Sequence, residues 1–282
     1  MYNTVYNPQL HQLIPNLPRA RHVLLSSVIP PNRAPELIAM YNLRGLQESR
    51  ASTNRPNISY QVVKPQNGLD YLRNFLASYR STCTGKIIIY CQSTEDVRQV
   101  ATELGCVAWH PNSDDYTRAI ITRHFLTDNS EGIKVVVATS VFAGDIDIRN
   151  VRLVVHYRQP VSLTELAVQA GRAGRDGNPA ISLTILDHAQ PLMWAVNPAT
   201  GRTDTYEHSL KMEYFGPTAH CRRFVLSAFV DGHEHAVVCD STMREELCDL
   251  CYSRESSEQS THGMDNDDGY QGNFVTSVEV YS

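Results

Sequence analysis

The sequence predicts an α/β domain built on a parallel sheet, and three observations carry this prediction. Short apolar runs alternate with amphipathic segments between residues 52 and 190. Runs such as Ile87 to Ile89 and Val135 to Val137 contain no alternating polar residues, as expected of strands that helices cover on both faces. The 282 residues are 42% hydrophobic and 20% charged, which is typical of a globular protein with a core.

Within that domain the expected elements follow one another regularly. The expected strands are 58–63, 86–91, 106–110, 134–139, 151–157 and 181–186, and the expected helices are 68–80, 93–105, 114–126 and 163–174. Strands that alternate with helices are typical of a parallel sheet. Ser93 and Thr94, followed by Asp96, supply capping side chains where strand 86–91 gives way to a helix.

The flanking segments differ in character. Residues 22–31, HVLLSSVIPP, predict a buried strand that ends at two prolines, and residues 34–43 predict a helix. The polar stretch 47–57 predicts a domain boundary near residue 50. Beyond residue 190 the sequence predicts a helix within 220–232 and holds four of the seven cysteines. The polar, acidic residues after Tyr252 predict a disordered tail. The expected units are therefore 1–48, 52–190, 191–252 and 253–282.

Charge and composition narrow the function classes. A net charge of −5 argues against a globally basic DNA-coating protein, while a local basic groove stays possible. No signal peptide and no apolar run long enough to cross a bilayer are seen in the sequence, so we expect a soluble, intracellular protein without a membrane partner. In that setting, clustered cysteines suggest a metal rather than disulfides.

Residues 171–177, GRAGRDG, hold two arginines in a glycine-rich stretch. If the preceding helix continues through them, Arg172 and Arg175 face the same side and can both meet a phosphate group. A lone motif of this kind is more often a glycine turn with two solvated arginines. We expect this loop and two others, 91–96 and 139–147, to lie along one edge of the sheet, where such sheets bind ligands.

Several segments together resemble a known family. Residues 138–157 and 171–180 resemble the fifth and sixth motifs of the RecQ family of superfamily 2 DNA helicases, and residues 86–104 resemble its fourth motif region. Residues 22–31 resemble the third motif and residues 52–63 the junction between the two motor domains. Residues 108–110, Ala-Trp-His, with Arg118 resemble the family's Tyr-His and arginine pattern. The resemblance covers about residues 8 to 252 and is closest to the fungal, telomere-linked RecQ-like group.

The resemblance implies a motor of two RecA-like domains that hold ATP between them, with an arginine finger from the second. It implies that Arg175 is the finger and Arg172 its companion. It places the nucleotide near Asp147, Gln169, Gly171 and Gly174, and the DNA backbone near Ser93, Thr139 and Ser26. A family member would be a 3′ to 5′ helicase in the nucleus, acting in DNA repair and recombination.

The 282 residues contain no Gly-x-x-x-x-Gly-Lys-Ser/Thr loop and no Asp-Glu-x-His box. We therefore expect residues 1–48 to be a remnant of the first motor domain, and the chain alone not to hydrolyse ATP. ATP and Mg²⁺ would bind only together with a missing first motor domain.

The remaining motifs also depart from the family pattern. Asp145 stands where the family has glycine, Val168 and Gln169 where it has Gln-Glu, and Ser27 and Val28 where it has Ala-Thr. The alternatives are a non-catalytic DNA-binding or partner-binding module, and the product of a degenerate gene.

A second constellation points to zinc. Cys248 and Cys251 form a Cys-x-x-Cys pair, and with Cys221 and Cys239 they would complete a four-thiolate shell for Zn²⁺. The resemblance places the zinc module of RecQ helicases here, although the interval between Cys239 and Cys248 is wider than usual, so His235 is a competing ligand.

Other reactive side chains favour plain interpretations. Cys83, Cys91 and Cys106 are expected in the core. His110 is expected to be structural or near DNA rather than catalytic, and Trp109 and Tyr116 are expected to pack rather than to stack on bases.

Overall fold

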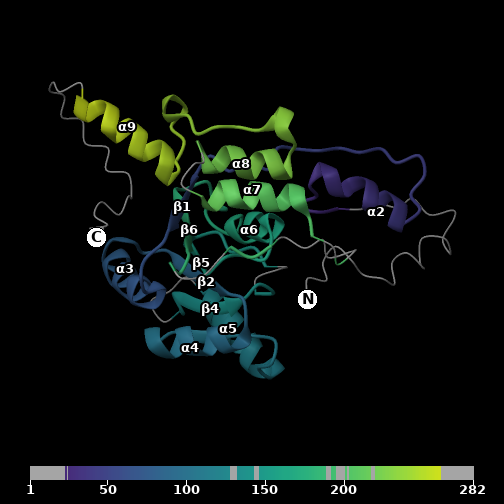
Figure 1. Ribbon diagram of the computed structural model, residues 1–282. Helices are drawn as coiled ribbons and strands as arrows, with labels where there is room; N and C mark the ends of the chain where they lie inside the picture. Colours follow the sequence, from purple (N-terminus) through teal and green to yellow (C-terminus); the bar gives the residue numbers. More distant parts are fainter. Residues whose placement is uncertain are drawn as a thin grey trace.

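The computed structural model describes residues 23, 25–127, 132–142, 146–188, 192–194, 201, 203–216 and 220–261 (Figure 1). Its centre is a six-stranded sheet in the order β1-β6-β5-β2-β4-β3, in which all neighbouring strands are parallel. The strands are β1 Ile58–Val63, β2 Lys86–Cys91, β3 Val107–Trp109, β4 Val135–Thr139, β5 Val151–Tyr157 and β6 Ala180–Ile185. The predicted α/β class with a parallel sheet is confirmed.

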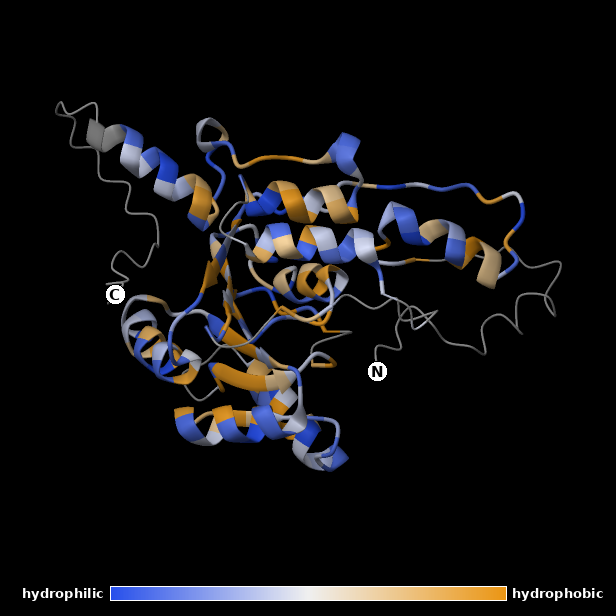
Figure 2. Ribbon diagram, in the orientation of Figure 1, coloured by the Kyte–Doolittle hydropathy of each residue, from blue (hydrophilic) through white to orange (hydrophobic). Residues whose placement is uncertain are grey.

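Helices cover both faces of the sheet. On one face, α3 (Gly68–Thr82) and α4 (Thr94–Leu104) pack against a core with Ile87, Ile89 and Val137. On the other face, α5 (Asp115–Leu126), α6 (Leu163–Ala170), α7 (Thr205–Phe215) and α8 (Arg222–Val230) pack against Ile88, Val136 and Val154. Figure 2 shows orange, hydrophobic residues concentrated in the strands of the sheet, which fits burial on both sides.

Polar side chains begin five of the helices. Asn67, Ser93, Asp114, Ser162 and Asp204 each accept a hydrogen bond from a backbone N–H in the first turn of α3, α4, α5, α6 and α7. These bonds satisfy amides that have no partner inside the helix. The predicted capping role of Ser93 is confirmed.

The segment before β1 differs from the prediction. Residues 23 and 25–30 form no strand, and the residues Val23 and Leu25 are 77% and 91% exposed. An apolar run becomes a buried strand only beside another strand, and the one sheet of the described residues does not extend to this segment. The predicted helix that follows is confirmed as α2, Ala34–Met40, which comes directly after a short 3₁₀ helix, Pro31–Arg33.

The segment after β6 joins the same core as the sheet. Tyr214, Phe215, Cys221 and Cys248 belong to the hydrophobic cluster on the α6 face. Hydrogen bonds add to this packing, because Ser59 Oγ donates to Leu247 O at 2.7 Å.

The last described helix, α9, spans Asp249–Thr261. The expected start of a disordered tail at residue 253 is therefore wrong, since the helix continues through 261, and 262–282 lie outside the described residues. The hydroxyls of Ser253 and Ser256 donate to the carbonyls of Asp249 and Tyr252 one turn earlier, so both side chains find their hydrogen-bond partners within the helix. Within the described residues, no helix is both long and apolar enough to cross a membrane.

Candidate nucleotide and metal sites

The three loops expected along one edge of the sheet lie at two opposite edges. Ser93 and Thr139 lie at the carboxyl ends of β2 and β4. Residues 171–177, here called the arginine loop, lead from α6 into the amino end of β6, and Gly174 N donates to Val151 O, at the start of β5, at 2.8 Å. A helix that connects two parallel strands returns the chain to the opposite edge, so the expectation of one shared edge is wrong.

The arginine loop is a tight turn rather than a continued helix. Helix α6 ends at Ala170, and Gly174 has φ +56°. A Cβ atom at Gly174 would lie 2.4 Å from Asn57 Nδ2 and 2.8 Å from Asn178 O. Only glycine combines this backbone conformation with so close an approach. Arg172 and Arg175 therefore do not share a helix face, because the left-handed residue separates them.

Arg175 points toward the segment that precedes β5. Its Nη1 donates to Ile146 O at 2.9 Å and to Asp147 Oδ1 at 3.2 Å. Asp147 also pairs with Arg149, whose Nε lies 3.3 Å from Oδ2. The hydrogen bond from Arg175, and then the one from Arg149, hold the pKa of Asp147 below its ordinary value. The structure thus brings Arg175 and Asp147 together in an exposed ion pair.

Gln169 is turned away from this ion pair. Its side chain is buried, with Oε1 2.8 Å from His156 Nδ1 and Nε2 2.7 Å from Glu165 Oε1. The other ring nitrogen of His156 lies 3.1 Å from Ser182 Oγ. Burial lowers the pKa of His156 to about 4, so the imidazole is neutral and the network is structural. A nucleotide contact from Gln169 is not available in this arrangement.

The other residues of the predicted nucleotide site have backbone or partly buried positions. Gly171 caps α6, and its carbonyl accepts from Arg175 Nε at 3.4 Å. Arg172 is half-buried. Burial raises the pKa of the Tyr90 phenol, and the charge of Arg172 opposes this shift. These residues surround the same turn as Arg175.

The residues predicted to touch DNA differ in accessibility. Ser93 is exposed, but its hydroxyl donates to Asp96 Oδ2 at 2.7 Å and caps α4. Thr139 is buried, and its Oγ1 has no hydrogen-bond partner among the described residues. Ser26 is exposed and forms a local turn, with its Oγ 3.1 Å from Val28 O. Thr139 is thus the one of these three that holds an unsatisfied hydroxyl.

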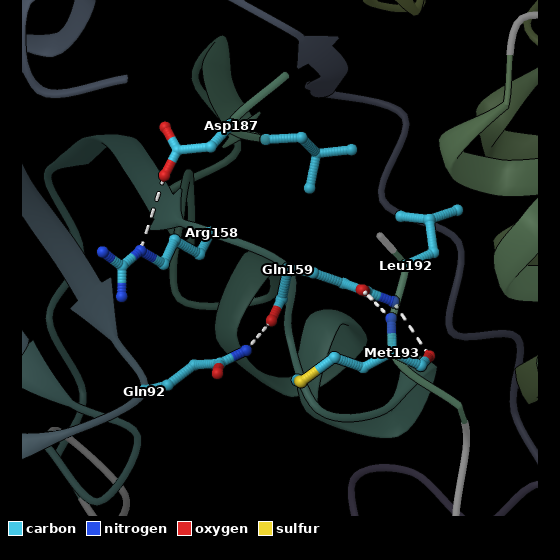
Figure 3. Close-up of a pocket in the computed structure, with 7 residues that line it drawn as sticks. Gln92, Arg158, Gln159, Asp187, Leu192 and Met193 are labelled. Carbon is cyan, nitrogen blue, oxygen red and sulfur yellow. Dashed lines mark hydrogen bonds and ion pairs between the residues drawn. The ribbon is translucent and has the colours of Figure 1, made fainter. Parts of the chain in front are cut away.

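A small pocket lies at the carboxyl edge, between the ends of β2, β5 and β6 (Figure 3). The lining residues are Gln92, Arg158, Gln159, Leu186, Asp187, Leu192 and Met193. Arg158 has φ +74°, and its guanidinium contacts Asp96 at 2.7 Å and Asp187 at 3.6 Å. The helix after β2 and the helix after β5 cover opposite faces of the sheet. Parallel sheets often bind ligands at the carboxyl edge between two such strands. This tendency is the signal by which the sequence could have pointed to the pocket residues.

Four cysteines meet beside α8 and the start of α9. The sulfur atoms of Cys221, Cys239, Cys248 and Cys251 all lie within 4.8 Å of one another, and Cys221 Sγ lies 3.6 Å from Cys239 Sγ. Zn–S bonds of about 2.3 Å in a tetrahedron require sulfur atoms roughly 3.8 Å apart, so these four could hold a Zn²⁺ ion. Among the described residues His235 is not part of this cluster.

The surroundings of the cluster favour negative charge on sulfur. Cys239 N and Cys248 N donate to the sulfur atoms of Cys221 and Cys239 at 3.4 and 3.3 Å. Arg223 Nε lies 3.5 Å from Cys239 Sγ, and Arg254 Nη2 lies 3.1 Å from Cys251 Sγ. Such donors orient metal-bound thiolates in proteins.

The remaining cysteines, His110 and Trp109 have the structural roles expected of them, and Tyr116 does not. Cys91 is buried, and Cys83 and Cys106 pack against the same core. His110 is buried with Nδ1 3.2 Å from Ser113 Oγ, and Trp109 packs on Phe142. Tyr116 is 75% exposed on α5, so its expected packing role is wrong.

Comparison with known proteins finds similarity to helicases. Residues 67–177 match the family "Helicase conserved C-terminal domain". The chain is 28% identical over 254 residues to the ATP-dependent DNA helicase RecQ of Haemophilus influenzae, which covers 86% of the chain and 39% of that protein. It is 29% identical over 261 residues to the bifunctional 3′-5′ exonuclease/ATP-dependent helicase WRN of Mus musculus, which covers 84% of the chain and 18% of that protein.

A solved structure, the E. coli DEAD-box protein SrmB bound to regulator of ribonuclease activity A, aligns with 45% of the chain at 20% identity and a TM-score of 0.38. The family match and the curated relatives support a helicase C-terminal domain in this chain. Both of these curated relatives are named as ATP-dependent helicases, and the first is a RecQ. The chain spans well under half the length of either curated relative.

Proposed function

We propose that this chain is the C-terminal motor region of a RecQ-like, ATP-dependent 3′ to 5′ DNA helicase. The observation that carries the proposal is the side chain of Arg175, presented at the surface by the arginine loop within the matched domain. In a two-domain motor, such an arginine stabilises the charge that develops on the transferred phosphoryl group.

The contacts of Arg175 suit this role. Its guanidinium is held in place by the carbonyl of Ile146, while Asp147 supplies an exposed carboxylate that a phosphate group can replace. An exposed ion pair is worth little, whereas a phosphate offers more charge and a better match to the guanidinium fork. Arg172, Gly171 and Gly174 would complete the turn beside the nucleotide.

The nucleotide itself would need a second RecA-like domain. Because the 282 residues lack a Walker loop and an acidic box, that domain would hold ATP and Mg²⁺ and would be this chain's motor partner. The segment before β1 would lie at the junction between the two domains.

DNA would pass over the carboxyl edge of the sheet. The hydroxyl groups of Ser93 and Ser26 are at the surface, whereas that of Thr139, at the end of β4, is buried and would need a local rearrangement to reach DNA. Such groups contact the phosphate backbone without reading base sequence.

Zn²⁺ would bind to the four cysteines and support residues 220–252 against β1. We also propose, from the family resemblance, a nuclear location and a role in DNA repair, recombination or telomere maintenance.

The positions of Asp147 and Gln169 favour a second candidate function, a non-catalytic DNA-binding or partner-binding module. Asp147 neutralises Arg175, and Gln169 is committed to the buried His156 network. Such a module would bind DNA with a strong dependence on salt and without any effect of nucleotide.

The experiment is complementation in trans. The full chain is mixed with the purified ATP-binding half of a RecQ helicase, and ATP hydrolysis is measured with and without single-stranded DNA. We expect DNA-stimulated hydrolysis that Arg175→Ala lowers by about a thousandfold and Arg149→Ala retains, because both arginines contact Asp147 but only Arg175 belongs to the arginine loop. Absence of stimulation, with salt-dependent DNA binding, would favour the second candidate.

A further inference from the structure

A chain of hydrogen bonds connects the cysteine cluster with the arginine loop. It begins at Arg223, at the start of α8, whose side chain is 2% exposed. Its Nε donates to Cys239 Sγ at 3.5 Å, and its Nη1 donates to the carbonyl of Arg55 at 2.7 Å. One guanidinium group therefore contacts a predicted metal ligand and the segment before β1 at the same time.

The segment 53–57 depends on these contacts for its position. It contains no strand or helix, and Arg223 also donates to Asn54 Oδ1 at 2.9 Å and to Ile58 O at 3.1 Å. Glu246, two residues before Cys248, donates its N–H to Pro56 O at 2.8 Å. Donors from the cysteine-bearing part of the chain thus hold the backbone on both sides of Arg55.

Arg55 makes the next link. Its guanidinium donates to three carbonyls of the arginine loop, those of Gly171 at 3.2 Å, Ala173 at 3.1 Å and Gly174 at 2.8 Å. Asn57 Nδ2 adds bonds to the carbonyls of Gly174 and Asn178, both at 2.8 Å. Bonds from a charged donor are among the stronger ones in proteins, so these contacts define where the turn before Arg175 lies.

We propose that metal binding at the four cysteines positions the arginine loop through Arg223 and Arg55. A bound ion fixes Cys239 Sγ, Cys239 fixes Arg223, Arg223 fixes the backbone of Arg55, and Arg55 holds the loop that carries Arg175. Arg223 and Arg55 are positioning residues, since each would act on Arg175 through the groups to which it bonds and not on the phosphate itself. The consequence for catalysis rests on the role proposed above for Arg175.

The test is hydrogen–deuterium exchange of the full chain, without nucleotide or DNA. Zinc-loaded protein is compared with protein stripped by a chelator and with stripped protein to which Zn²⁺ is returned. We expect zinc removal to accelerate exchange of peptides covering the arginine loop by about tenfold, with recovery on return of zinc. In Arg55→Ala the loop should exchange fast already, and zinc removal should add less than about twofold.

Two variants serve as matched controls. Arg254 contacts Cys251 Sγ and the carbonyl of His220, and among the described residues its side chain has no bond to segment 53–57 or to the arginine loop. Arg254→Ala protein with a full equivalent of zinc should therefore show the loop exchange of the unaltered chain. Arg152 pairs with Asp176 of the arginine loop and takes no part in the Arg223–Arg55 connection, so Arg152→Ala should loosen the loop and yet keep its response to zinc. Exchange in β2 and β4 reports whether the sheet stays folded.

Unchanged loop exchange on zinc removal, or in Arg55→Ala, overturns the proposal, as does a purified chain that binds no zinc. If zinc removal also unfolds the sheet, the zinc-loaded variant Arg223→Lys is compared with the zinc-loaded unaltered chain. The proposal expects faster exchange of the arginine loop in this variant while β2 and β4 stay protected. Unchanged loop exchange in the variant overturns the proposal. The exchange measurement needs no ATP. If loop exchange responds to zinc as expected but the complementation experiment shows no ATP hydrolysis, the result contradicts the helicase role and leaves this proposal standing.

Discussion

Arg175 Nη1 lies 3.2 Å from Asp147 Oδ1, so the arginine proposed to act on ATP is paired with an exposed carboxylate. Both residues come from connections that enter the amino edge of the sheet, one before β5 and one before β6. The ion pair holds the guanidinium of Arg175 toward the segment before β5. A phosphate group that binds Arg175 would have to compete with the carboxylate of Asp147.

Removal of this competitor should strengthen phosphate binding. We expect Asp147→Asn to bind tripolyphosphate several-fold more tightly than the unaltered chain, because the asparagine keeps the size of the side chain and loses its charge. Isothermal titration calorimetry at low salt measures the effect. The double variant Asp147→Asn/Arg175→Ala should lose the gain, and an equal affinity of both variants would show that the anion binds elsewhere.

The turn of the arginine loop should require glycine at position 174. Gly174→Ala combines a positive φ with a clash against Asn57 and the carbonyl of Asn178, so we expect a loss of more than about 2 kcal/mol in the free energy of unfolding. Urea denaturation measures it. Gly177 also has a positive φ, of +82°, but open space around a Cβ, so Gly177→Ala should cost only about 1 kcal/mol. Equal losses would contradict the close approach seen at Gly174.

The buried His156 should make the chain sensitive to acid. Its folded pKa is lowered to about 4 from 6.5, so the unfolded chain binds the extra proton as pH falls between these values. Stability is therefore present above about pH 6.5 and decreases toward pH 4, by roughly 3 kcal/mol from this group. Urea denaturation across this range should show a shallower decrease for His156→Asn than for the unaltered chain or for His188→Asn, where the imidazole is exposed.

The four cysteines should hold one zinc ion per chain. We expect Cys251→Ser to lower the zinc content to well below half an equivalent and to reduce the Tm by about 5 °C or more, because ion binding contributes to folding. Metal analysis and thermal unfolding measure the two effects. Cys106→Ser, which alters a cysteine of the α/β core, should keep the zinc. Zinc that stays bound in both variants would exclude the four-cysteine site.

Strands and helices with a strong hydrophobic pattern could be predicted from the sequence, and elements without one could not. Strands such as β2 and β4 were predicted because uninterrupted apolar runs have few other solutions in a folded chain. The same kind of run at 22–31 misled, since a strand needs a partner that local sequence does not reveal. The short helix extension of α9 was missed because its residues are polar on all sides.

The site was predictable in part for a similar reason. Arg175, Asp147 and the cysteines belong to motifs with a recognisable spacing. Arg55 and Arg223 carry no such signal, because their partners lie 116 and 168 positions away along the chain and are mainly backbone carbonyls. The buried position of Gln169 likewise depends on His156 from another strand.

The most direct test of the proposed motor role is the effect of Arg175 on steady-state ATP hydrolysis by the complemented enzyme with saturating DNA. For Arg175→Ala we expect kcat to fall by about a thousandfold or more, with the KM for ATP nearly unchanged, because a finger acts on the transition state. Arg149→Ala should behave as the unaltered chain does. A higher KM with an unchanged kcat, or no effect of Arg175→Ala, would contradict the assignment of Arg175 as the arginine finger.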